Sequence, residues 1–303
     1  MLSSALLSFG SRISGRAVPC LAELPACVAA AHRLAQLRTD ERISVPKTAR
    51  LFSTAGSTGT EAAYEGESPD PSPPRVVVFG GNGYVGTNVC KASLNLGLAV
   101  SAVGRSGRPP YKMEPWGDEV DWVAADALQP ESYSQALEGA AGVICCIGGF
   151  GSNETMLKVN GEANIRALEA AAAAGVLRAV FVSAHDYKFP SFVLQGYFQG
   201  KRNAESALQS LFPDSGVILR PGFIHGTRMV GSTGLPLGLI GQPLEQVLKY
   251  LPTKQLVGIP LAGVGFVPPV SVEKVARVAA VAVSDSSVDA GILDPWELQA
   301  FAA

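Results

Sequence analysis

The sequence has few of the side chains that ligate metals, form disulfides or carry charge. It contains three histidines and five cysteines, and 17% of its 303 residues are charged. No cysteine has the C-x-x-C spacing of a zinc or redox site, and five is not the even count of a disulfide framework. We therefore predict no metal site, a reducing compartment, and a role as buried strand residues for the adjacent Cys145 and Cys146.

Long apolar runs are missing as well. The sequence has no apolar helix of about 18 residues, the length that a membrane span needs. Its two uncharged runs, residues 229–244 and 255–271, are broken by proline and glycine. Such runs are typical of an apolar pocket lining or a surface patch, so we predict no transmembrane span.

Acidic residues are absent from residues 1–22, which contain serines, arginines and an apolar face instead. This is the composition of an organellar transit peptide. Residues 49–55 (ARLFSTA) resemble the arginine-containing cleavage sites of mitochondrial precursors. We predict a mitochondrial transit peptide over 1–52 and a protein of the matrix or peripheral to the inner membrane. A plastid is the alternative, because its transit peptides share this composition.

The rest of the chain is acidic. Residues 1–52 hold seven basic and three acidic residues of a chain with net charge −2, so the remainder carries −6. An acidic body without basic clusters argues against nucleic acid as a partner. Residues 53–74 are rich in serine, glycine, proline and acid, and they lack the apolar residues that offset ordering entropy. We predict that they form a disordered linker.

An apolar strand runs into a glycine-rich turn at residues 75–86 (RVVVFGGNGYVG). Gly81, Gly83 and Gly86 have the G-x-G-x-x-G spacing, which permits a tight turn, close approach to a pyrophosphate, and helix–strand packing. The pyrophosphate then lies at the N-terminus of the following helix. The turn therefore predicts a dinucleotide site, formed by Gly80, Gly81, Asn82, Gly83, Tyr84, Val85 and Gly86.

Strands and helices alternate after this turn. We predict strands at 76–79, 98–103, 120–124, 142–147, 178–183 and 216–219, and helices at 84–96, 131–138, 153–174 and 195–211, with stops at Gly97, Gly139 and Gly175. The alternation predicts an α/β fold with a doubly wound parallel Rossmann sheet over residues 75–221. Residues 222–303 are expected to form a small C-terminal lid or substrate region, whose helices at 242–250 and 271–284 pack back on the Rossmann core.

The end of the second strand bears on the choice between NAD and NADP. An NAD site places an acid there for the ribose hydroxyls, whereas an NADP site offers arginine. Arg105, Ser106 and Arg108 follow this strand and no acid does, so NADP(H) is favoured and NAD(H) is the alternative. Asp126, after the third strand, is either an adenine-side contact or the N-cap of the next helix.

A tyrosine and a lysine lie four residues apart on the predicted helix 195–211. Tyr197 and Lys201 therefore share one helix face. A nearby ammonium lowers the pKa of a phenol toward the working range of an acid–base catalyst, and Lys201 could also hold the nicotinamide ribose. Ser183 ends the fifth strand, at the sheet edge where ligands bind, and could hydrogen-bond a substrate carbonyl. The alternative is an ordinary amphipathic-helix pair.

Other polar residues are less specific. Asn160 lies on the predicted helix 153–174, where it either orders a water near Lys201 or faces solvent. His185 and His225 follow strand ends, where each either lines the substrate cleft or is a loop histidine with satisfied hydrogen bonds.

Together, the glycine turn, Ser183, the Tyr197/Lys201 pair, residues 159–161 (VNG) and residues 219–226 (LRPGFIHG) resemble the extended and atypical short-chain dehydrogenases/reductases. The resemblance covers residues 75–285 and implies an NAD(P)-binding Rossmann fold. It implies the catalytic residues Ser183, Tyr197 and Lys201 with Asn160 in support, and further cofactor contacts at Cys146, Gly148, Lys201, Pro221 and Phe223.

Within this superfamily, residues 148–153 (GGFGSN) and 221–228 (PGFIHGTR) resemble a mitochondrial branch. That branch includes the short-chain-dehydrogenase-like subunit of the coenzyme Q synthesis complex and its plant and algal relatives. The nucleotide-binding accessory subunit of respiratory complex I is a more distant cousin.

Three functions are therefore open. The first is an NADP(H)-dependent oxidoreductase acting on an apolar, quinone-like substrate, because the lid region is rich in leucine and isoleucine, although a plain hydrophobic core explains them equally well. The second is a nucleotide-binding structural subunit of a quinone-synthesis or respiratory complex at the inner membrane. The third is a nucleotide-sugar epimerase or dehydratase.

Overall fold

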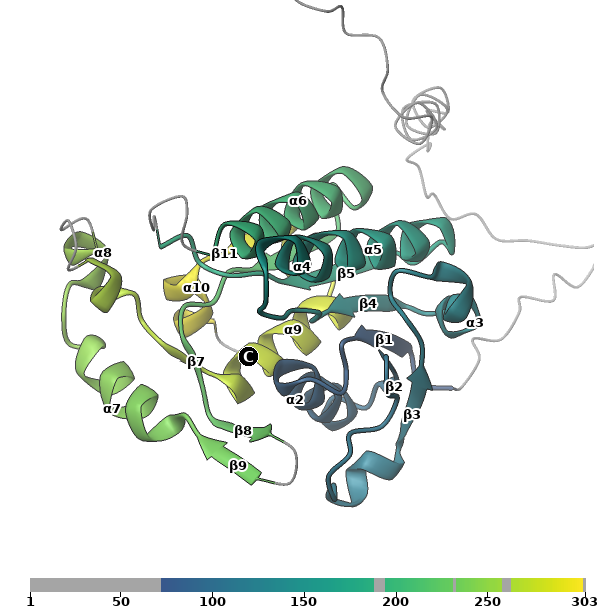
Figure 1. Ribbon diagram of the computed structural model, residues 1–303, viewed down its shortest axis with the longest axis horizontal. Coiled ribbons are helices and arrows are strands. Elements are labelled where there is room, and N and C mark those ends of the chain that lie inside the picture. The colour runs from purple at the N-terminus through teal and green to yellow at the C-terminus, as the bar shows by residue number, and fades with distance from the viewer. Residues whose placement is uncertain (1–71, 188–193, 231–232, 258–262, 302–303) are drawn as a thin grey trace, which may run out of the picture. The chain divides into compact units, whose positions relative to one another are not determined.

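The structure, a computed structural model, describes residues 72–187, 194–230, 233–257 and 263–301 (Figure 1). The predicted transit peptide and nearly all of the predicted linker lie outside the described residues.

The centre of the described fold is one sheet of parallel strands. It consists of β1 (Arg75–Phe79), β2 (Ala99–Gly104), β3 (Val120–Ala124), β4 (Gly142–Cys145), β5 (Arg178–Val182), β6 (Gly216–Leu219) and β11 (Gly291–Leu293). The strand order is β11-β6-β5-β4-β1-β2-β3, so the direction of winding reverses between β1 and β4. This order confirms the predicted doubly wound α/β fold.

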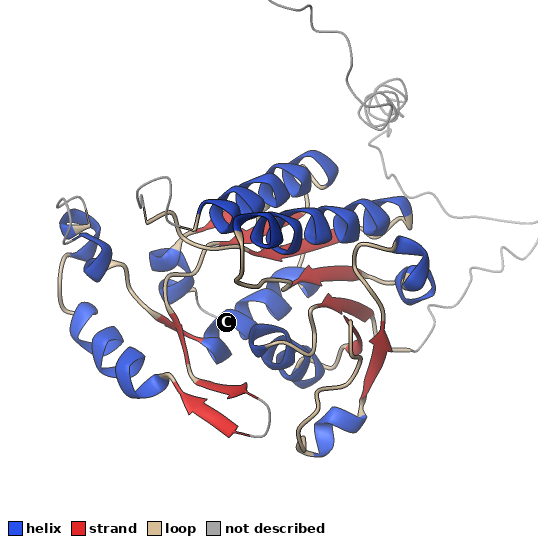
Figure 2. Ribbon diagram, viewed as in Figure 1, coloured by secondary structure: helices blue, strands red, loops and turns tan. Residues whose placement is uncertain are grey.

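Helices cover both faces of the sheet (Figure 2). The side chains of β1 alternate between the two cores: Val77 and Phe79 belong to one, and Val76 and Val78 to the other. The first core is covered by α3 (Ser134–Leu137), α5 (Ala163–Ala173) and α6 (Gln195–Leu211), and the second by α2 (Tyr84–Asn95) and α9 (Val272–Ser284). Burial on both faces explains why the strands read as continuous apolar runs.

Most predicted boundaries agree with the structure within two residues, and Gly97, Gly139 and Gly175 all have positive φ angles as helix stops. The predicted helix 153–174 is divided. It consists of α4 (Asn153–Leu157), a π-helical turn η3 (Lys158–Glu162) and α5. The predicted helix 131–138 is a 3-10 turn η2 (Pro130–Ser132) followed by the short α3, and another 3-10 turn, η1 (Pro115–Asp118), precedes β3.

The residues after β6 contain several short elements. They are β7 (Ile224–His225), β8 (Thr227–Val230), β9 (Thr233–Pro236), α7 (Gly238–Leu248), α8 (Thr253–Leu256), η4 (Gly263–Phe266), β10 (Val270–Ser271) and α10 (Pro295–Ala300). The predicted helix 242–250 is α7, which begins four residues earlier. Ser271 accepts a hydrogen bond from the Lys274 amide and caps α9, which agrees with the predicted helix 271–284. None of the helices in the described ranges is long and apolar enough to span a membrane.

Candidate functional site

The glycine turn lies between β1 and α2 and is held against β2. The Gly80 amide donates to the Val103 carbonyl at 2.8 Å, and Gly80 has a φ of +74°. A Cβ on Gly86 would collide with the Gly80 carbonyl, and one on Gly81 would lie 2.6 Å from the Ala102 Cβ. These close approaches explain the glycine spacing.

The N-terminus of α2 is open to an anion. Gly83 occupies the N-cap position, offers no side-chain cap, and the first turn of the helix contains no acidic residue. The first amides of the helix therefore carry their partial positive charge toward the turn.

A cavity of about 510 Å³ lies beside the turn, at the carboxyl ends of β1, β2 and β4. Seven predicted contacts line it: Gly80, Asn82, Gly83, Arg105, Asp126, Cys146 and Gly148. The sequence did not predict the remaining lining residues, which are Val103, Gly104, Ala125, Ala127, Leu128, Ile147, Lys158, Val159 and Ala163. The cavity has the location at which open α/β sheets bind nucleotides.

The two arginines that follow β2 have different surroundings in the structure. Arg105 lines the cavity, whereas Arg108 pairs with Asp118 at 2.7 Å. Asn82 donates to the Ser106 hydroxyl at 2.8 Å and so ties the glycine turn to the Arg105 loop. Asp126 lines the cavity and accepts a hydrogen bond from the Leu128 amide within a turn. The N-cap of the next helical turn, η2, is Gln129, so the predicted capping role was wrong.

Two buried asparagines hold the loop that follows β4. The Asn160 amide nitrogen donates to the Gly149 carbonyl at 2.8 Å, and its oxygen accepts from the Gly149 amide at 3.2 Å. Asn164 donates to the Ile147 carbonyl at 3.2 Å. Asn160 is fully buried, so the surface interpretation was wrong. π-Helical turns such as η3, which contains Asn160, occur frequently at functional sites.

Lys201 is buried directly behind this loop. Its ammonium donates to the Ile147 carbonyl at 3.1 Å and to the Val182 carbonyl at 2.8 Å, and lies 4.7 Å from the centre of the Phe181 ring. Burial lowers the pKa of Lys201 to about 8. The lysine therefore joins the carboxyl ends of β4 and β5.

Tyr197 lies in the first turn of α6 and stacks on Phe150, with ring centres 5.2 Å apart. Burial raises the pKa of its phenol, and the charge that partly opposes this effect belongs to Arg202. The sequence predicted that Lys201 would lower this pKa. That expectation was wrong, because the lysine side chain points to the backbone carbonyls of β4 and β5.

Ser183 follows β5, and its amide donates to the Leu219 carbonyl at 2.8 Å. Its hydroxyl is buried and has no hydrogen-bond partner in the part of the chain that the structure describes. Nearby His185 packs edge-on against Tyr187 and Trp296, and burial lowers the pKa of the histidine. Aromatic rings and one unpaired hydroxyl therefore occupy the carboxyl edge of β5.

An ion-pair cluster that the sequence did not predict supports this edge. Glu205, on α6, is buried and accepts from Arg220 at 2.9 Å and from Arg202 at 2.7 Å. Arg202 also donates to the Ala184 carbonyl. The cluster fixes the segments that follow β5 and β6.

Several predicted cofactor contacts lie away from the cavity lining. The Tyr84 hydroxyl is buried near Gly226, and Val85 and Gly86 pack within the fold. Pro221 and Phe223 also do not line the cavity, and Phe223 is 43% exposed. His225 is buried and contacts Glu245 at 2.5 Å.

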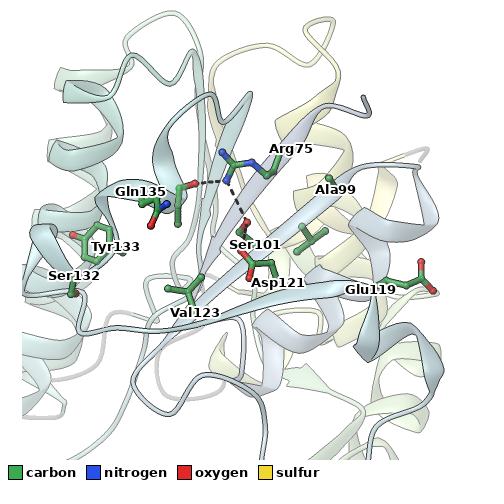
Figure 3. Close-up of a pocket in the computed structure, with 11 residues that line it drawn as sticks. Arg75, Ala99, Ser101, Glu119, Asp121, Val123, Ser132, Tyr133 and Gln135 are labelled. Atoms are coloured by element: carbon green, nitrogen blue, oxygen red, sulfur yellow. Dashed lines mark hydrogen bonds between the residues drawn. The ribbon is translucent and has the colours of Figure 1, made fainter. Parts of the chain in front are cut away.

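A second cavity of about 580 Å³ opens near the amino ends of β1 and β2 (Figure 3). Arg75 donates to the Ser101 hydroxyl at 3.4 Å, and Ser101 donates to Asp121 at 3.1 Å. These polar groups are satisfied by one another, and the cavity lies at the opposite end of the strands from the glycine turn. The first cavity is therefore the better candidate for a nucleotide site.

Comparison with known proteins indicates an NAD(P)H-binding domain. A family model described as NAD(P)H-binding matches residues 80–234. An uncharacterized chloroplastic protein of Arabidopsis thaliana is 44% identical over 214 residues, which are 70% of this chain and 72% of that protein. MIOREX complex component 2 of Saccharomyces cerevisiae is 39% identical over 85 residues, 27% of this chain and 31% of that protein.

Solved structures share the fold at low identity. The Bordetella bronchiseptica enzyme WbmH, in complex with NAD+, has a TM-score of 0.51 and 17% identity, covering 73% of this chain and 75% of that one. At this identity the likeness supports the Rossmann architecture alone.

Proposed function

The chain belongs to the NAD(P)H-binding family of atypical short-chain dehydrogenases/reductases, and from this premise we propose that it is an NADP(H)-dependent reductase of a carbonyl group on an apolar, quinone-related substrate. The observation that carries this proposal is the buried Ser183 hydroxyl, which lacks a partner at the ligand-binding edge of the sheet. A buried hydroxyl without a partner is costly, and a substrate oxygen would satisfy it.

The residues of the first cavity fit a dinucleotide. The crowded glycine turn admits a pyrophosphate against the open N-terminus of α2. Arg105 and Ser106 offer the 2′-phosphate a cation and a hydroxyl where an NAD site would carry an acid. Cys146 and Gly148 line the cavity after β4, with Lys201 behind them, and would hold the nicotinamide half of the cofactor.

Side chains of the protein would then supply the proton and orient the substrate. The hydride for the carbonyl carbon would come from NADPH when it is bound. Tyr197 donates a proton to the carbonyl oxygen, and its raised pKa keeps the phenol protonated at neutral pH, which suits the reductive direction. Ser183 donates a hydrogen bond to the same oxygen, and Lys201 keeps one N–H for the nicotinamide ribose.

The substrate class follows from the rings around Tyr197. Phe150 is 66% exposed and stacks on Tyr197, so it presents a flat apolar surface. Planar rings stack favourably on such surfaces. Leu235 and Leu239 add exposed apolar area in the lid region. A sugar substrate would call for more hydrogen-bonding groups than these residues offer.

One observation favours a second candidate, a nucleotide-binding structural subunit. Phe150 covers the Tyr197 ring, and the Lys201 ammonium is engaged by two backbone carbonyls. The similarity to a yeast complex component supports the same candidate. In this case bound NADP(H) would stabilise the protein within an assembly for quinone synthesis or respiration.

The location that we propose is the mitochondrion, on the composition of residues 1–52. The chloroplastic relative supports the plastid alternative. Import of the full chain into isolated mitochondria and chloroplasts, followed by N-terminal sequencing, tests the choice. Processing near Ser53 by mitochondria supports the proposal, whereas import by chloroplasts alone overturns it.

The function is tested by purifying the protein, identifying its bound nucleotide, and measuring NADPH oxidation with short-chain quinones. Tyr197→Phe should lower turnover about 100-fold or more while nucleotide content is unchanged. Tyr250→Phe is the matched control, because this phenol is 89% exposed and lies on the lid. If wild type and Tyr197→Phe bind nucleotide equally and neither turns over, the enzyme proposal is overturned. The structural subunit is then the remaining candidate.

A further inference from the structure

The helix α7 presents an unusual face to solvent. Its inward face consists of Gly241, Glu245 and Leu248, which pack toward β7, where Glu245 meets the buried His225. The outward face includes Leu239, Pro243, Val247 and the following Tyr250, which together we name the α7 stripe, and the exposed Gln242 and Gln246 lie beside them. A surface helix normally has the opposite arrangement, with its apolar side chains inward.

The α7 stripe is strongly exposed. Leu239 is 76%, Val247 60% and Tyr250 89% exposed. α7 lies on the far side of β7 from the parallel sheet (Figure 1). These side chains therefore contribute little to the Rossmann core, and clustered exposed apolar residues of this kind mark binding surfaces.

The segment that contains the stripe has a net positive charge. Residues 222–272 contain three basic residues, Arg228, Lys249 and Lys254, and one acid, Glu245. The carboxylate of that acid is engaged by His225 at 2.5 Å and by Lys249 at 3.2 Å. The segment therefore carries a net charge of +2 in a chain whose total is −2.

We infer that the α7 stripe docks on an anionic lipid surface. Protruding leucine and valine side chains can enter the acyl boundary, while an exposed tyrosine and flanking lysines suit the headgroup level. The basic charge complements anionic headgroups. This inference does not depend on the proposed reaction.

Flotation of the full chain with vesicles tests the inference. Wild type should float with vesicles that contain phosphatidylglycerol and bind much less to phosphatidylcholine alone. The double variant Leu239→Ser/Val247→Ser should lower the bound fraction about tenfold or more. Lys249→Gln and Lys254→Gln should each weaken binding about fivefold and reduce its sensitivity to salt.

Leu177→Ser is the matched control. Leu177 is 79% exposed but lies before β5, outside the α7 stripe, so its replacement should leave flotation unchanged. Equal thermal unfolding of the variants confirms that exposed positions were changed without loss of the fold.

A local reporter separates the stripe from any other membrane-binding segment. Tryptophan fluorescence of Tyr250→Trp should shift to the blue on addition of anionic vesicles, whereas that of Leu177→Trp should not. Absence of wild-type flotation, or an unshifted signal at position 250, overturns the inference. So does a change of oligomeric state in the Ser variants without vesicle binding, which would make the stripe a protein interface.

Discussion

Arg105 and Arg108 follow the same strand, but they have different neighbours. Arg105 lines the nucleotide cavity, and Arg108 pairs with Asp118 in an exposed ion pair. Exposed ion pairs contribute little to stability, so replacing Arg108 should have little effect. Replacing Arg105 should instead affect nucleotide binding. The geometry makes Arg105 the better candidate for the 2′-phosphate.

Replacement of Arg105 should therefore change cofactor preference. Arg105→Glu removes a charge-assisted contact and adds repulsion, so NADP(H) affinity should fall about tenfold to a hundredfold while NAD(H) affinity changes little. Fluorescence titration with NADPH and NADH measures both constants. Arg108→Gln is the control and should leave both affinities within about twofold. Equal losses of NADPH and NADH binding in Arg105→Glu would contradict the 2′-phosphate contact.

Lys201 should make stability depend on pH. Burial lowers the pKa of Lys201 to about 8 in the folded protein, whereas an unfolded lysine titrates near 10.4. Between these values the unfolded chain binds a proton that the folded chain does not, so the free energy of unfolding rises with pH through this window. Lys201→Met abolishes this contribution, which is on the order of 3 kcal/mol.

Urea unfolding of wild type and Lys201→Met at several pH values from about 7 to 10.5 measures this contribution. The difference in unfolding free energy between the two proteins should change with pH, with wild type gaining at high pH. The loss of the two hydrogen bonds to carbonyls changes the unfolding free energy of Lys201→Met by the same amount at every pH. It therefore does not alter how the difference between the two proteins depends on pH. Parallel curves would contradict the lowered pKa.

At the residue scale, the sequence predicted the glycine turn and the position of Arg105 after β2, but not the two carbonyls that Lys201 meets. The glycine spacing is local, because the turn, the cap of α2 and the pyrophosphate site arise within a few residues. The direction of a long side chain on α6 depends on which strand ends it meets. Helical spacing placed Tyr197 and Lys201 on one face, but the carbonyls of Ile147 and Val182 attract the lysine.

At the scale of elements, the site depends on a close contact between two helical segments. Gly161, in the π-helical turn η3, meets Gly200 on α6 with backbone against backbone. This approach brings Asn160 and Lys201 to the same loop after β4. Glycine at both positions is therefore required by packing, although it is unfavourable in a helix.

Gly200→Ala should destabilise the protein. A Cβ at this position would lie 2.8 Å from the Gly161 amide nitrogen, so the helices must separate, at a cost of about 1–3 kcal/mol. In an exposed helix the replacement of glycine by alanine would stabilise the protein by about 1 kcal/mol. A lower unfolding free energy for Gly200→Ala would therefore show that Gly200 is packed against Gly161. Urea unfolding measures it, with the exposed Ser206→Ala expected to stay within about 0.5 kcal/mol of wild type. A stabilised Gly200→Ala would contradict the packing.

Elements with long periodic patterns were predicted well, and short ones were not. The range 195–211 agrees with α6, and 120–124 and 216–219 agree with β3 and β6. β11 has three residues, too few for a periodic signal, and exists because β6 offers a free edge. The π-helical turn η3 likewise depends on tertiary contacts, because it packs against α6.

At the scale of the described fold, the last residues of the chain complete the Rossmann core. β11 pairs in parallel with β6 and extends the sheet. Leu298, on α10, is fully buried, and Asp294 forms a capping box with Glu297 at the start of that helix. Lys274, on α9, donates to the Phe301 carbonyl at 2.5 Å.

A chain that ends at Val288 should therefore not fold cooperatively. It loses the fully buried Leu298 and several half-buried apolar side chains, a cost of about 5 kcal/mol, which is comparable with the whole stability of a typical domain. It also exposes the β6 edge to intermolecular pairing. Circular dichroism should show no sigmoidal thermal transition, and a chain that ends at Phe301 is the control with wild-type behaviour. A cooperative transition at the wild-type temperature in the shorter chain would mean that the sheet is complete without β11, and that residues 289–301 serve the lid rather than the core.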